Sequence, residues 1–190
     1  MLQTKWLGVD IGSNHDKSAF CTIGEANGEL YVQDIEILSK AEYVHQQAKI
    51  VDLNSKNHYT GGYIDACGLG GPLAEYVNKS PNCSKIKGFF TTGTNKPKQY
   101  ERLRSKIFER KIHFSKSLKT VLMLEFSKLT KIVNDKGVAT YIAARDEDGH
   151  CDRTSALVLA LQAYADNPAN MTTPSGWQYG SAFGSWSSRL

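Results

Sequence analysis

Hydrophobic and polar residues follow one another along the chain in patterns that predict a succession of strands and helices. Six segments are of strand type, rich in β-branched and aromatic residues: 5–12, 17–24, 30–39, 62–67, 86–92 and 138–144. Five segments carry apolar residues at helical spacing: 41–53, 73–78, 97–110, 118–129 and 152–165. Asn27-Gly28 is typical of a hairpin turn between the second and third strands. This order predicts an α/β fold with a mixed central sheet and helices on both faces.

The chain of 190 residues has the size of one globular domain. We expect this domain at residues 1–165, because residues 166–190 are rich in Gly, Ser and Thr with isolated aromatics. That composition is typical of a flexible tail that docks onto a partner. No apolar run approaches the roughly 20 residues of a membrane-spanning helix, and no signal pattern opens the chain. The four cysteines form no CxxC pair, which favours reduced thiols over zinc or disulfides.

The net charge of +4 is distributed unevenly along the chain. Residues 79–136 contain fifteen basic and four acidic residues, a net charge of +11, so the remainder carries −7. This asymmetry suits a protein that binds a polyanion with one face and keeps its acids elsewhere. The best candidates for contacts with phosphates are Lys96, Lys98, Arg102 and Arg104. A solvated basic surface without a partner is the alternative.

Asp10 is an unusual residue for the middle of a half-buried strand. Alternation places it with Trp6 and Gly8 on one face, and a carboxylate there needs a partner. A metal ion would be such a partner, and a lysine or arginine is the structural alternative. Asp16 follows a flexible turn and is an accessory candidate, although aspartate is also an ordinary turn residue.

Two further aspartates stand where sites are often found. Asp65 ends a short strand before a glycine-rich turn, and ligands of α/β proteins bind at the carboxyl ends of strands. Asp152 begins the last predicted helix, where it either caps the helix or sends a carboxylate into a site. His150 is expected to support that site. Three carboxylates on separate elements would suit two hard divalent cations, which can carry out phosphodiester hydrolysis.

Four stretches resemble, in order, the motifs of large terminase nuclease domains of tailed double-stranded DNA phages. They are GVDIGSNHDKSAF at 8–20, YIDACGLGGPLAEYV at 63–77, GFFTTGTNKPKQYERL at 88–103 and HCDRTSALVLALQAY at 150–164. The resemblance implies a ribonuclease H-like fold and an endonuclease that depends on Mg²⁺ or Mn²⁺ and cleaves concatemeric DNA during genome packaging. It also implies that Asp10, Asp65 and Asp152 bind the metal ions and that Asp16 is an accessory acid.

The resemblance further implies partners and a location: a terminase ATPase domain, a small terminase subunit, a portal, and the cytoplasm of an infected host. The chain departs from the family at Cys151, where many relatives have an acid. It also has no GxxxxGK[ST] phosphate loop, so no ATPase site is expected in it.

Other functions remain open at this point. A Holliday-junction resolvase, or another ribonuclease H-like nuclease, would carry the same acids. GVDIGS with the later DACGLGG also resembles the phosphate loops of actin, heat-shock ATPases and sugar kinases. A DNA-binding module without catalytic activity is a further alternative.

Overall fold

The computed structural model describes residues 4–12, 16–133, 135, 139–143 and 151–167, and it confirms the predicted mixed sheet. The strands of this sheet are β1 (Thr4–Asp10), β2 (Lys17–Ala26), β3 (Glu29–Ser39), β4 (Gly61–Asp65), β5 (Ile86–Phe89) and β6 (Ile112–Phe114). They lie in the order β5-β4-β1-β2-β3-β6. β1, β2 and β3 pair antiparallel, whereas β4 and β5 continue the sheet parallel to β1, and β6 lies parallel to β3.

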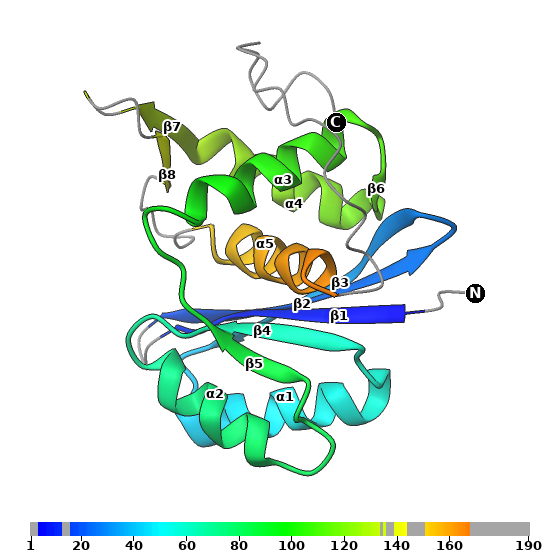
Figure 1. Ribbon diagram of the computed structural model, residues 1–190, viewed down its shortest axis with the longest axis vertical. Helices are drawn as coiled ribbons and strands as arrows, with labels where there is room; N and C mark the ends of the chain where they lie inside the picture. Colours follow the sequence, from blue (N-terminus) through cyan, green and yellow to red (C-terminus); the bar gives the residue numbers. More distant parts are fainter. Residues whose placement is uncertain (1–3, 13–15, 134, 136–138, 144–150, 168–190) are drawn as a thin grey trace.

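Helices cover both faces of the sheet, as the sequence predicts (Figure 1). The described helices are α1 (Tyr43–Asn57), α2 (Gly70–Lys79), α3 (Lys96–Phe108), α4 (Lys116–Lys128) and α5 (Asp152–Ala165). In Figure 1, α1 and α2 lie on one side of the sheet, and α5 lies on the other with α3 and α4 outside it. Two separate hydrophobic clusters result, one on each face of the sheet.

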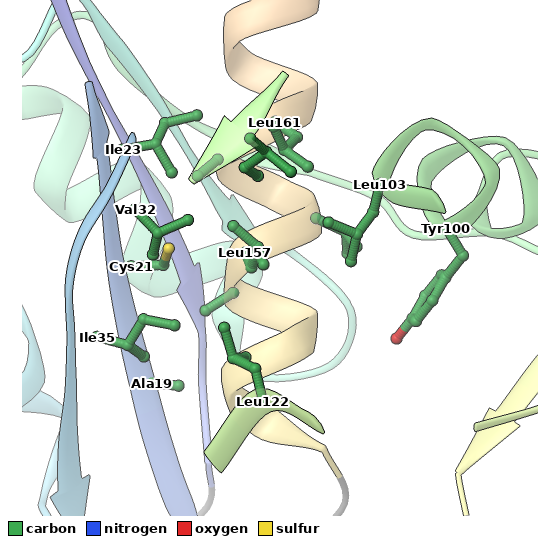
Figure 2. Packing of buried hydrophobic residues seen from close by; sticks show 14 of the residues in the cluster. Ala19, Cys21, Ile23, Val32, Ile35, Tyr100, Leu103, Leu122, Leu157 and Leu161 are labelled. Carbon is green, nitrogen blue, oxygen red and sulfur yellow. The ribbon is translucent and has the colours of Figure 1, made fainter. Parts of the chain in front are cut away.

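The last helix, α5, forms the centre of the larger cluster. Figure 2 shows Leu157 and Leu161 of α5 between the sheet and the side chain of Leu103, and Leu122 belongs to the same cluster. A helix that is apolar around most of its circumference is expected to be buried on more than one side. α5 is therefore a layer of its own between the sheet and α3 and α4, and not the one-faced helix that its spacing of leucines suggests.

Some elements differ from the prediction. Strand β6, of three residues, was not expected, and neither was β7 (Leu129–Val133), which pairs with β8 (Ala139–Ala143) as a separate two-stranded sheet. Three residues are too few for an alternating pattern to be recognised. α2 begins at Gly70, three residues before its predicted start, so Pro72 lies inside the first turn of the helix. Such a position is still compatible with a proline because the first helical N–H groups have no intrahelical acceptor.

The folded part of the chain extends slightly past residue 165. The carboxylate of Asp166 accepts hydrogen bonds from the Tyr63 hydroxyl at 3.0 Å and from Nε2 of Gln162 at 2.7 Å. The predicted tail from 168 onward lies outside the described residues. Among the helices of the described part, none combines the length and the apolar character needed to cross a membrane.

Candidate active site

Two of the predicted acids end neighbouring strands of the sheet. β1 and β4 run parallel, and Val9 is paired with Ile64, so the residues that follow them, Asp10 and Asp65, lie side by side at the carboxyl edge. Ile64 packs in the cluster on the α1 side, so alternation turns Asp65 toward α5, as it does Asp10. The strand pairing thus brings both carboxylates to the same edge and the same face.

A glycine lets the last helix approach this edge closely. A Cβ atom at Gly8 would lie 2.0 Å from the carbonyl oxygen of Ala156 and 2.3 Å from the amide nitrogen of Ala160. Only glycine therefore permits this contact between β1 and α5. Asp10 lies two residues beyond Gly8 on the strand, and Asp152 lies one helical turn before Ala156. The distance from Gly8 to Asp10 along the strand is similar to that from Ala156 to Asp152 along the helix, about 6–7 Å each. The close contact at Gly8 therefore helps to hold Asp152 near Asp10.

The N-terminus of α5 is capped by a side chain from another helix. Asp152 is the first helical residue, and the N-cap is Cys151, which has φ 65° and makes no side-chain cap. Oε2 of Glu125, on α4, instead accepts from the Thr154 backbone N–H at 2.8 Å and from its hydroxyl at 2.7 Å. Oε1 of Glu125 accepts from Nη1 of Arg153 at 3.2 Å. The capping role that the sequence allowed for Asp152 therefore belongs to Glu125, which leaves the Asp152 carboxylate outside the cap.

The environment of Asp10 is strongly unfavourable for a negative charge. Part of the residue's surface is still exposed, but loss of hydration is the largest effect on it. Burial and the charges of Asp152 and Asp65 raise the pKa of Asp10 to about 8, with a smaller contribution from Glu125, while a hydrogen bond with Ser155 lowers it. The electrostatic coupling places Asp65 and Asp152 near Asp10, as the sequence predicts.

Ser155 connects Asp10 to a layer of aromatic side chains. Its hydroxyl lies 3.5 Å from the hydroxyl of Tyr100, which stacks on Tyr141 at 5.1 Å between ring centroids. Burial raises the pKa of Tyr100 to about 12, so this phenol is neutral at ordinary pH. Sequence reasoning missed both Ser155 and Glu125, because their partners are distant in the sequence and no local pattern marks them.

The described acids do not form a finished coordination shell. Within the described residues, no group of three or more His, Cys, Asp or Glu side chains is arranged to hold a metal ion. The strongest charged neighbours of Asp10 are nevertheless all carboxylates, which a nearby cation would stabilise together. Carboxylate oxygens are suitable ligands for hard divalent ions. The residues present therefore fit a cation, and side-chain rotation or further ligands would have to complete its shell.

Of the two supporting residues predicted from the sequence, the structure describes only Asp16. Asp16 is exposed at the start of β2, and its backbone oxygen accepts from the N–H of Lys40 at 3.2 Å. Its accessory role in the metal site stays a prediction. His150 lies outside the described residues, so its supporting role stays a prediction.

The four predicted phosphate-binding residues lie on α3, but their side chains differ in availability. Nη1 of Arg102 donates to Oε1 of Gln162 on α5, and burial lowers the pKa of Arg102. Nη1 of Arg104 lies 3.6 Å from Oε2 of Glu101. Nζ of Lys96 lies 5.9 Å from the ring centroid of Tyr100, whereas Lys98 is exposed. Binding of DNA by these residues stays a prediction.

Comparison with known proteins identifies the fold. The chain matches no family model, and no curated protein sequence is similar to it. It is similar in structure to the large terminase nuclease from thermophilic phage G20c with bound magnesium, at 20% identity and a TM-score of 0.66, over 84% of this chain and 80% of that one. The Thermus phage P74-26 large terminase nuclease domain has 16% identity and a TM-score of 0.65, over 86% and 81% of the two chains.

A longer protein gives a similar match. The large terminase from another thermophilic bacteriophage, in complex with ATP-γ-S, is 12% identical with a TM-score of 0.62, and the match covers 85% of this chain but only 41% of that one. At these identities the similarity concerns the fold, and it agrees with the resemblance carried by the sequence motifs. This chain has the ribonuclease H-like fold of the large terminase nuclease domains.

Proposed function

We propose that this chain is a divalent-metal-dependent endonuclease that cleaves double-stranded viral DNA during genome packaging. The observation that carries the proposal is that Asp65 and Asp152 lie close enough to Asp10, at the carboxyl edge of β1, for their charges to act on it. Solved structures of the same fold support it, since they are large terminase nucleases with bound magnesium, cobalt or zinc.

In this proposal Asp10, Asp65 and Asp152 hold two Mg²⁺ or Mn²⁺ ions. Such ions, when bound, activate a water molecule and stabilise the oxygen that leaves in phosphodiester hydrolysis. Asp10 must lose its proton to act as a ligand, because its raised pKa keeps much of it neutral near pH 7. Ser155 orients the Asp10 carboxylate through their hydrogen bond. Lys96, Lys98, Arg102 and Arg104 contact the backbone phosphates.

The wider assignment follows from the same family. A terminase ATPase domain, a small terminase subunit and a portal are the proposed partners, and the host cytoplasm is the proposed location. The chain has no phosphate-loop motif, so the proposal places ATP hydrolysis on a different domain or chain.

Cleavage of supercoiled plasmid with and without Mn²⁺ tests the proposal. The unaltered chain should cut only with the metal, and Asp10→Asn, Asp65→Asn or Asp152→Asn should each abolish cutting. Asp34→Asn is the matched control, because Asp34 is an exposed acid on β3. It should cut like the unaltered chain. Cutting by Asp10→Asn at the unaltered rate would refute the metal site.

Binding of the metal ions has its own measurement. Addition of Mg²⁺ or Mn²⁺ should raise the melting temperature, because a ligand of the folded state stabilises it. The Asn variants should lose this gain, since an amide is a poorer ligand for hard cations. Equal cleavage of linear duplex and four-way junctions would fit the packaging enzyme. A strong preference for junctions would favour a resolvase instead.

A further inference from the structure

A small basic pocket lies next to the acidic cluster, on elements that the sequence keeps far apart. Its volume is about 170 Å³. Three cations line it, Lys17 of β2, Lys128 of α4 and Arg153 of α5, together with Glu125. Cys151 and two apolar side chains of α4 complete its wall. Since a water molecule takes up about 30 Å³ of liquid, the pocket has room for several atoms of a ligand.

Strand register places this pocket beside the candidate active site. Asp10 is paired with Ala19 across the antiparallel strands β1 and β2, and paired side chains point to the same face. Lys17 lies two residues before Ala19 and therefore points to that face as well. Arg153 directly follows Asp152 in the first turn of α5. The pocket is thus bordered by residues that adjoin two of the three acids.

The charges of the lining favour an anion. Among the described residues that line the pocket, three are cations and one is a carboxylate, that of Glu125, which already accepts from Thr154 and Arg153. An arginine has five N–H donors, and the bond from Nη1 to Glu125 uses one of those of Arg153. The remaining donors, with two lysine ammonium groups on separate elements, form a setting for a phosphate.

We propose that this pocket binds a backbone phosphate of the substrate strand, next to the phosphate that is cut. The inference rests on the proposed nuclease function and adds a specific contact to it. A phosphate held by Lys17, Lys128 and Arg153 fixes the position of its neighbour along the strand, which then reaches Asp10 and Asp152. The lysines hold the strand without reading its sequence, because phosphates carry no sequence information.

The test measures DNA binding as a function of salt, in the Asp10→Asn background so that no DNA is cut. The double variant Lys17→Ala/Lys128→Ala should bind a short duplex more weakly. Because Arg153 remains in this variant and all three cations serve one phosphate, the slope of log affinity against log salt should become shallower by up to about 0.9. Lys56→Ala is the matched control, because Lys56 is on α1, on the opposite side of the sheet. It should keep the original slope.

Further outcomes show whether the charge of the lysines or their packing matters. They also distinguish failure of the phosphate site from failure of the proposed nuclease function. Lys17→Arg/Lys128→Arg keeps both charges and should bind like the parent, and an equal loss in this variant would overturn the phosphate site. An unchanged slope in the alanine variant would also overturn it. If the slope is unchanged but the unaltered chain still cleaves plasmid with Mn²⁺, the phosphate site is refuted and the proposed nuclease function stands. Absence of both cleavage and DNA binding would refute the nuclease together with the site.

Discussion

Replacement of Glu125 on α4 by alanine removes the side chain that caps the N-terminus of α5. The N–H and the hydroxyl of Thr154, which is fully buried, would both lose their acceptor. Each buried donor without a partner costs about 1–3 kcal/mol. The variant also loses a charge that raises the pKa of Asp10, but that contribution is smaller than those of burial, Asp152 and Asp65. We therefore expect the free energy of unfolding to fall by about 3 kcal/mol.

Thermal unfolding without added metal measures this loss. In a chain of this size, about 3 kcal/mol lowers the melting temperature by about 6–12 °C. Ser115→Ala is a matched control, since the Ser115 hydroxyl is an exposed cap of α4 that accepts from the N–H of Leu118 at 3.3 Å. An ordinary cap contributes about 1 kcal/mol. If Glu125→Ala costs no more than Ser115→Ala, the reasoning about the cap is wrong.

Three other predictions concern the same face of the sheet and the tail. In the unfolded chain Asp10 has its ordinary pKa of 3.8, so folding takes up a proton between about pH 4 and 8. The free energy of unfolding without metal should therefore fall as the pH rises through that range. Calorimetry of Asp10→Asn should show a flatter dependence on pH. Gly8→Ala should cost about 3 kcal/mol or more and abolish cleavage, while Gly61→Ala, whose Cβ would lie 3.7 Å from the nearest atom, should be tolerated. Deletion of residues 168–190 should leave plasmid cleavage unchanged. Loss of folding in this variant would show that the aromatic residues of the deleted segment belong to the core.

The sequence predicted the parts of this molecule that depend on local pattern. Alternation along β1 placed Asp10 and Gly8 on one face, and the last helix was predicted to begin at about Asp152, where α5 begins. Both result from side-chain periodicity, which the backbone imposes.

Contacts between elements that are far apart in the sequence could not be predicted from local sequence patterns. Glu125 lies in an ordinary helical stretch, and nothing near it in the sequence shows that Thr154 will donate to its carboxylate. Lys17 similarly gave no sign that it would share a pocket with Arg153. Such contacts depend on how α4 and α5 pack against each other, which a single sequence without relatives does not specify.

The packing of the first strand against the last described helix has a consequence for synthesis. Contacts between β1 and α5 join residues at nearly opposite ends of the described chain, and contacts of such long range form late in folding. A chain that emerges from the ribosome with its N-terminus first can pair β1, β2 and β3 early. It cannot bring Asp152 to Asp10 until α5 has been made. The proposed hydrolytic activity would therefore begin only after translation has passed α5, and no shorter nascent chain would cleave DNA.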